Sequence, residues 1–490
     1  MKWIFLAALV VLGVATFALY ATRQAAVTSD APVLYLAIPP GPDSLDTLKA
    51  YQGWLKETGL PAVDLRVDPA NSDATKVIIQ GISGIGSDLI PTSFGADMQY
   101  LHATGLLTDL TPNSAQEGFG PETILPAARD ETMIDGRQYG YPTLLYVLMN
   151  YINVDTFAQV GMATPPARMN FDQFEAIGKE FVAKANPPGQ KARRFFCNGL
   201  APLPMRRSLG LDTFNETLTR CTLDDPRNAQ VLERIDKWTN QDHLFPSAAD
   251  MASFTTDGST AAAFGPRIYQ FRIGNIAIIG GSSYLAQTFR QWPDLKLAVT
   301  EPPYGEFSNA VFGASMLSIY AGSKHPDAAR TYLHFLASSD YFQWVIKAAV
   351  GIPANAEAAH SAAYLRPPDH PAEWPCNERF VDAIEQIGIP YTSCPYVLYS
   401  VYSTLDDDAV QRYNAGLCSA PEAGRRAADA INEEIQRTLT QQPELRARYD
   451  TMVERQHAID ALRARGEKVP LAWIENPFYR RYYQFKQWAE

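Results

Sequence analysis

Short apolar runs alternate with amphipathic segments over the first 110 residues, and this alternation limits the folds open to the chain. The run at 33–38 ends in Pro-Pro-Gly-Pro, as a buried strand does before a turn. Together the runs predict strands at 33–38, 63–67 and 88–90 and helices at 44–58, 73–81 and 96–104. Strands that alternate with helices at this spacing build βαβ units. We therefore predict an α/β fold with mainly parallel sheets and helices on both faces.

The length predicts more than one domain, because a single domain usually has about 100–200 residues and this chain has 490. Further along, 171–290 is predicted to be mostly helical with proline-rich breaks, and 420–465 helical. The 42 basic and 53 acidic residues leave a net charge of −11. Nucleic acid is therefore a poor candidate partner, since binding to phosphate backbones needs a positive field.

The N-terminus indicates export. Lys2 precedes an apolar run from Ile4 to Ala21, which predicts a signal peptide or a short membrane anchor; a buried core helix is the alternative. The candidate cleavage sites at 19–21 and 27–29 are weak. We therefore favour an uncleaved N-terminal hydrophobic helix that anchors the protein, with its body periplasmic or at the cell surface.

Five cysteines agree with export without proving it. Two bridges and one free thiol fit the odd number, and the pairs with the shortest loops are Cys197 with Cys221 and Cys376 with Cys394. Buried unpaired thiols remain the alternative. No spacing of Cys and His resembles a zinc site, and no metal or cofactor is expected.

Motifs of the common enzyme classes are missing from the sequence. It contains no GxSxG, P-loop, complete GxGxxG or HExxH. The glycine-rich stretch at 81–86 fits neither phosphate-binding pattern and predicts a helix end with a turn. A pair of catalytic carboxylates is not excluded by counting, but nothing singles one out.

Several stretches, in order, resemble the bacterial extracellular solute-binding proteins of carbohydrate ABC importers, the family of maltose- and glycerol-phosphate-binding proteins. The family's "tyr-gly-x-pro … tyr-asn-x-asp-x-phe" has its counterpart at 139–142 and 151–157, and its "ser-lys-x-pro-glu-ala-ala" at 323–329. Phe171 stands where the family usually has Trp, and the lipid-bearing Cys is missing. The matching stretches are 87–90, 105–110, 139–142, 151–157, 161–174, 254–269, 323–336 and 351–355.

The resemblance implies a two-lobed, Venus-flytrap periplasmic-binding-protein fold that binds a ligand without breaking bonds. It implies lobe 1 at 32–142 and 303–345, lobe 2 at 143–302 and 346–440, and a helical, aromatic tail at 441–490 after an anchor and linker at 1–31. The implied function is the capture of a sugar or oligosaccharide for ABC permease subunits, by a monomer that is not an enzyme. An exported glycosidase or lyase and a membrane-tethered sugar sensor are the alternatives.

Ligand-binding candidates follow the predicted strands, because open α/β sheets bind ligands at the carboxyl ends of their strands. For Tyr141 and Tyr146 the alternative is core packing, for Arg267 a surface salt bridge, and for Asp97 a cap on the helix that begins there. Arg267 offers a planar fork of donors and Tyr269 a stacking face. The predicted set is Ser93, Phe94, Asp97, Tyr141, Thr143, Tyr146, Arg267, Tyr269, Gly313 and Ser315.

The C-terminal residues 473–488 are rich in aromatic and basic side chains. They could contact membrane headgroups or a permease. We favour the other interpretation, a helix packed back on a lobe.

Overall fold

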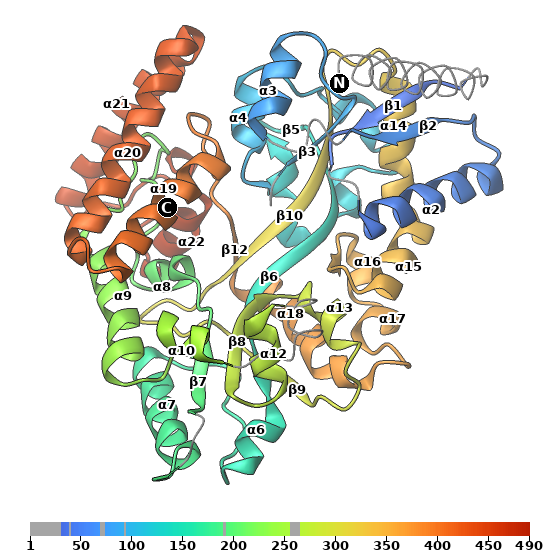
Figure 1. Ribbon diagram of the computed structural model, residues 1–490. Helices are drawn as coiled ribbons and strands as arrows, with labels where there is room; N and C mark the ends of the chain where they lie inside the picture. Colours follow the sequence, from blue (N-terminus) through green and yellow to red (C-terminus); the bar gives the residue numbers. More distant parts are fainter. Residues whose placement is uncertain (1–30, 39–40, 69–73, 93–94, 190–192, 255–264) are drawn as a thin grey trace, which may run out of the picture.

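The computed structural model describes residues 31–38, 41–68, 74–92, 95–189, 193–254 and 265–490. Two α/β lobes share one sheet, whose main path is β2-β1-β3-β10-β6-β8-β7, and a helical body lies beside them (Figure 1). The predicted N-terminal helix, Ser93 and Phe94 lie outside the described residues. Among the helices that are described, none is long and apolar enough to cross a membrane.

The first lobe confirms the predicted alternation of strands and helices. Its parallel strands β1, β2 and β3 pair through registers such as Leu36 with both Val67 and Leu89. The elements are β1 (Val33–Leu36), α2 (Pro42–Thr58), β2 (Asp64–Val67), α3 (Ala74–Ile82), β3 (Leu89–Thr92), α4 (Met98–Ala103) and α5 (Thr111–Ser114), followed by a hairpin of β4 (Met133–Ile134) and β5 (Arg137–Gln138). Apolar runs bounded by turns therefore placed these elements correctly.

Two long strands, β6 (Tyr141–Asn153) and β10 (Ala310–Ile319), connect the lobes. β6 pairs with β10 as far as Val147 and with β8 and β9 from Leu148 onward. These pairings are antiparallel, as is that of β10 with β3. Among the strands that the structure describes, β1 pairs in parallel with β2 and β3, β7 with β8, and β10 with β12. The sheet is mixed because each long strand crosses from one lobe to the other and another segment of the chain lies antiparallel beside it.

The second lobe contains strands that the helical prediction for 171–290 left out. β7 and β8 come from the apolar runs Phe195–Cys197 and Ile276–Ile279, which are too short for periodicity to tell a strand from a buried helix. Aromatic side chains such as Phe174 and Trp238 fill its core. The elements are α6 (Val154–Gln159), α7 (Phe171–Ala185), β7 (Phe195–Asn198), α8 (Pro202–Ser208), α9 (Pro226–Asp236), α10 (Ala248–Ser253), α12 (Pro266–Arg272), β8 (Ile276–Ser282), α13 (Leu285–Phe289) and β9 (Leu297–Thr300).

The chain after β10 covers both lobes. α15 packs on α2, and α18 packs on β9. The elements are α14 (Pro326–Leu336), α15 (Ser339–Ala348), β11 (Ile352–Pro353), α16 (Ala356–Ala359), α17 (Ala362–Leu365), α18 (Trp374–Ile387) and β12 (Gly388–Pro390). These elements cover the large hydrophobic core that includes β1, β6 and β10.

Residues 391–490 form what we call the C-terminal body. It contains α19 (Tyr399–Asn414), α20 (Ala420–Gln441), α21 (Arg446–Ala464) and α22 (Pro477–Lys486). α20 packs on α9, and Phe478 and Tyr483 of α22 are buried with Phe307 and Ile389. The prediction that the aromatic tail packs back on the body of the protein is therefore confirmed.

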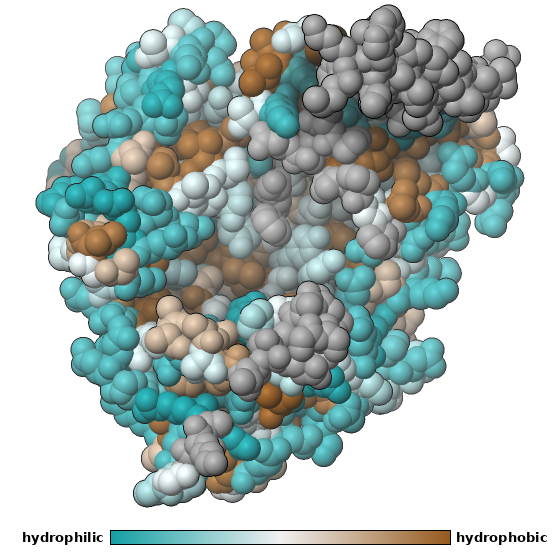
Figure 2. Space-filling model, in the orientation of Figure 1, coloured by the Kyte–Doolittle hydropathy of each residue, from teal (hydrophilic) through white to brown (hydrophobic). Residues whose placement is uncertain are grey.

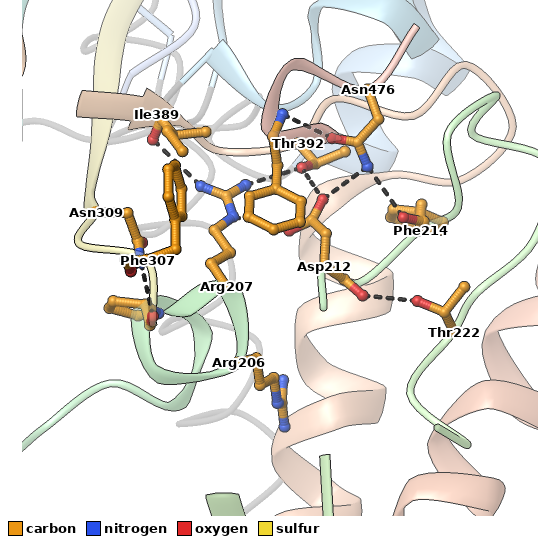
Figure 3. A network of polar contacts seen from close by, with 12 residues as sticks. Arg206, Arg207, Asp212, Phe214, Thr222, Phe307, Asn309, Ile389, Thr392 and Asn476 are labelled. Atoms are coloured by element: carbon orange, nitrogen blue, oxygen red, sulfur yellow. Dashed lines mark hydrogen bonds and ion pairs between the residues drawn. The ribbon is translucent and has the colours of Figure 1, made fainter. Parts of the chain in front are cut away.

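A buried polar network fastens this tail (Figure 3). Arg207 and Asp212, both fully buried, form an ion pair at 2.8 Å, and Thr392 donates to Asp212 at 2.6 Å. Asn476 donates to Asp212 at 2.8 Å and to the Phe214 carbonyl at 3.0 Å. Because every charge has a partner, the network joins α8, the loop after β12 and the start of α22 without leaving an unpaired buried ion.

All five cysteines are free, so the predicted bridges are wrong and the alternative of unpaired thiols is correct. Cys197, Cys221, Cys376 and Cys394 are buried, and Cys418 is half-buried. Burial raises the pKa of the Cys394 thiol to about 12, against weaker opposing hydrogen bonds from Tyr396 and Val397. Such a thiol is unreactive at neutral pH. The described residues contain no cluster of His, Cys, Asp and Glu fit to hold a metal ion.

Candidate functional site

The candidate site is built on one face of β6. Side chains alternate along a strand, so Tyr146, Leu148 and Asn150 share a face. Tyr146 lies opposite Gly313 and Leu144 opposite Ser315 on β10, while Asn150 lies opposite Gly280 on β8. This face therefore runs from the first lobe into the second without a break. The surface of the molecule is hollowed between the lobes in Figure 2.

A pocket of about 230 Å³ opens at the second-lobe end of this face. Apolar side chains make up most of its wall, and the Asn150 amide and the Arg267 guanidinium add polar groups. The lining residues are Leu148, Met149, Asn150, Gly199, Leu200, Ala201, Pro204, Met205, Arg267, Gly280, Gly281, Pro302 and Pro303. Its position at the carboxyl end of β7 is the one that open α/β sheets use for ligands.

Two glycines hold Arg267 in the wall of this pocket. Gly199 has φ +85°, and a Cβ there would collide with the Arg267 guanidinium. A Cβ on Gly280 would collide with the Gly199 carbonyl, so the two backbones can approach this closely only with glycine at position 280. Arg267 Nη1 donates to the Gly280 carbonyl at 2.8 Å. Its pairing with a described carboxylate, the predicted alternative, is not observed, and burial lowers the pKa of the guanidinium.

At the other end of the face, polar groups from both lobes meet near Tyr146. Its ring lies edge-on to Tyr284, with centroids 6.3 Å apart. Tyr284 Oη and Gln287 Nε2 each lie 3.4 Å from the Asp43 carboxylate at the start of α2. Burial, more than its neighbours, raises the pKa of the half-buried Tyr146 phenol, so it stays protonated and can donate a hydrogen bond.

Glu131 supplies a carboxyl beside the loop after β3. A Cβ on Gly95 would lie 3.3 Å from Glu131 Oε2. Burial raises the pKa of Glu131 to about 8, with a further rise from Asp130 and an opposing effect from Arg207. At neutral pH the carboxyl is therefore largely protonated, and it can both donate and accept hydrogen bonds.

The structure brings together some of the predicted residues and separates others. Thr143 and Ser315 are joined by a hydrogen bond of 2.9 Å from the Thr143 hydroxyl to the Ser315 carbonyl. Tyr141 is fully buried against Phe119, so core packing is the correct alternative for it. Tyr269 is half-buried on α12, outside the lining of the pocket.

Asp97 does not cap the helix that begins at its own position, so that alternative is wrong. Its buried carboxylate instead accepts a hydrogen bond from the backbone N–H of Tyr399 at 2.9 Å. A contact with a residue 302 positions away along the chain cannot be found from local sequence pattern.

Sequence reasoning missed Asn150, Gly199, Gly280 and Glu131. Asn150 is the one polar residue between Tyr146 and Tyr151 in an otherwise apolar stretch, and Gly280 begins a Gly-Gly pair directly after four apolar residues. Both are usable signals, since a lone polar residue or a glycine in a buried strand marks a special position. Gly199 and Glu131 offer no comparable signal.

Comparisons with known proteins agree with this architecture. The family model for bacterial extracellular solute-binding proteins matches residues 48–372. No curated protein sequence matches the chain. Among solved structures, an ABC substrate-binding protein from Listeria monocytogenes in complex with cycloalternan is 20% identical, with a TM-score of 0.67 over 83% of this chain and 100% of its own.

A maltose/maltodextrin-binding domain from Bdellovibrio bacteriovorus bound to maltotriose is 18% identical, with a TM-score of 0.60 over 82% of this chain and 100% of its own. An ABC transporter solute-binding protein from Agrobacterium vitis with bound D-mannitol is also 18% identical, with a TM-score of 0.62 over 83% and 99%. These likenesses support the two-lobed fold. From the family match, which covers well over half of its length, the chain belongs to the bacterial extracellular solute-binding proteins.

Proposed function

We propose that the protein captures a sugar or oligosaccharide between its lobes and delivers it to the permease subunits of an ABC importer. The observation that carries the proposal is the continuous face of β6, which joins Tyr146 to the pocket with Asn150 and Arg267. A sugar ring has apolar C–H faces and a rim of hydroxyl groups. An aromatic ring, an amide and a guanidinium match those two kinds of surface.

The ligands of the structural neighbours support the same class. Cycloalternan, maltotriose and D-mannitol, named with the three neighbours above, are all polyhydroxylated and uncharged. The pocket of about 230 Å³ is smaller than the usual 300–1,000 Å³ of a small-molecule site. A ligand longer than one sugar unit therefore extends along β6 toward Tyr146 and Asp43.

The proposed organisation keeps lobe 1 at 32–142 and 303–345, lobe 2 at 143–302 and 346–440, and a tail at 441–490. The lobes hinge where β6 changes partners, between Val147 and Leu148. The family is extracellular, and we propose that residues 1–31 remain attached and hold a monomer at the membrane. Cell fractionation should find the full-length protein with membranes. A soluble form that starts near residue 22 or 30 would contradict the anchor.

A thermal-shift screen tests the carbohydrate proposal. Cycloalternan, maltotriose and D-mannitol are added separately at increasing concentration, because a ligand at 100 times its Kd stabilises a protein by about 2.7 kcal/mol. The shift should disappear in Arg267→Ala and persist in Arg137→Ala, a control that removes a guanidinium exposed at 64%. No shift with any sugar or polyol would count against the proposal.

A further inference from the structure

The first lobe and the C-terminal body meet along a line of polar contacts that we call the α4 seam. On the α4 side lie Asp97, Gln99 and Tyr100; opposite them lie Ser393, Tyr399 and Gln442. The Tyr399 N–H donates to Asp97 Oδ1 at 2.9 Å, the Gln99 N–H donates to Ser393 Oγ at 3.0 Å, and Gln442 Nε2 lies 3.4 Å from Tyr100 Oη. The seam thus joins segments 294 to 342 positions apart.

Asp97 caps α19 from the opposite side of this seam. The first N–H groups of a helix have no partner within the helix, and Leu398, at the N-cap position of α19, provides no side-chain cap. The Asp97 carboxylate accepts the N–H of Tyr399, the first residue of α19, and is 3% exposed. A carboxylate at this end also interacts favourably with the helix dipole. The helix start is thereby completed by a residue of the first lobe.

The far side of the seam belongs with the second lobe. α19 packs on α20, and α20 packs on α9. The buried Arg206 of α8 forms a two-pronged ion pair with Asp406 of α19, with its second contact at 2.9 Å. α4, by contrast, follows β3 in the first lobe. A change in the angle between the lobes therefore acts directly on the seam.

The seam contains stabilising hydrogen bonds and also buried polar atoms that destabilise it. Gln99 Oε1, His102 Nδ1 and Gln442 Oε1 are buried there and have no hydrogen-bond partner among the described residues. Each such atom destabilises the closed seam, by roughly 1–3 kcal/mol in comparable cases, because water would form a hydrogen bond with it if the two sides separated. Contacts of this kind favour an interface that can open, unlike the fully paired network around Asp212.

We propose that the α4 seam is a latch between the lobes, and that Asp97 is the positioning residue that holds it. When the latch is made, the lobes stay in the present arrangement. When it is lost, the lobes spend more time apart. Affinity for a ligand then falls in proportion to the population of the competent state, although Asp97 need not touch the ligand.

The distance between two spin labels, one on each side of the seam, reports whether the latch is made, and the measurement needs no ligand. The labels are placed at Lys49→Cys on α2, where the side chain is 78% exposed, and at the exposed Gln230→Cys on α9. Cys418→Ser removes the one endogenous thiol that is not buried. In this background Asp97→Ala should lengthen and broaden the distance distribution, while the control Asp109→Ala, which removes a carboxylate at the surface of the same lobe, should not.

Ser393→Ala tests the seam from its other side and should lengthen the distance in the same direction, which protects the experiment if Asp97→Ala fails to fold. Asp97→Asn keeps one acceptor oxygen and should fall between wild type and Asp97→Ala. Apparent affinity for maltotriose, a readout that rests on the proposed function, should weaken by up to about five-fold in Asp97→Ala, because loss of a helix cap shifts the balance between the two lobe arrangements by about that factor at most.

The two proposals fail separately in this design. If Asp97→Ala and Ser393→Ala give the distance distribution of the Asp109→Ala control, the latch is refuted whatever sugar binds. If both lengthen the distance and maltotriose does not bind, the latch is supported and only the affinity readout is lost.

Discussion

Replacing Asn476 by Ala tests the polar network that fastens the C-terminal tail. The side chain is fully buried, its Oδ1 accepts the Phe478 N–H at 2.9 Å to cap α22, and its Nδ2 donates to Asp212 and to the Phe214 carbonyl. Loss of a cap costs about 1 kcal/mol. Leaving one buried acceptor without its donor costs about 1–3 kcal/mol more. We therefore expect the free energy of unfolding to fall by about 2–4 kcal/mol.

Urea unfolding, followed by tryptophan fluorescence and circular dichroism, measures this loss. Asn240→Ala is the matched control, since Asn240 is exposed and bonds Asp236 on the same helical turn; it should change stability by less than about 0.5 kcal/mol. If Asn476→Ala unfolds at the same urea concentration as the control, the polar network does not hold the tail in place.

Three further results are expected. Tyr146→Ala should weaken binding of a sugar found in the screen by about 1–3 kcal/mol in calorimetry, the usual value of an aromatic stacking face, and unchanged affinity would remove Tyr146 from the site. Burial raises the pKa of Glu131 from 4.5 to about 8, so the folded protein should lose stability as pH rises through that range. The difference in melting temperature between Glu131→Gln and wild type should therefore shift in favour of Glu131→Gln from pH 5 to pH 8.5. A difference that stays constant over this range would contradict the expectation. Deleting residues 471–490 should lower the melting temperature, because Phe478 and Tyr483 are buried; an unchanged value would argue against packing.

Local pattern was enough to predict the first lobe. Its strands and helices follow one another closely, and each is bounded by turn residues, so the βαβ units were placed without long-range information. Local pattern did not identify β7 and β8, because a run of three or four apolar residues fits a strand or a buried helix equally well. Their pairing with each other, 81 residues apart in the chain, is what makes them strands.

The candidate site was predictable where it follows a strand and not where it depends on distant contacts. Tyr146 was predicted as a candidate because it follows the signature Pro strand, where the chain passes between the lobes. Arg267 was also predicted as a candidate, but its contacts with Gly199 and Gly280 were not predicted, since three separate segments meet there. Asp97 was predicted to bind ligand or to cap its own helix, whereas its partner Tyr399 comes from a different part of the fold.

Calorimetric titration of a pocket-filling variant tests directly whether a sugar binds in the pocket on the β6 face. Leu200 lines the pocket of about 230 Å³, so Leu200→Trp should fill much of that volume, whereas Leu45→Trp adds the same ring to a side chain that is 51% exposed on α2. We expect saturable binding of a sugar from the screen to wild type and Leu45→Trp, and its loss in folded Leu200→Trp. Equal affinity for all three proteins would show that the sugar does not bind in this pocket.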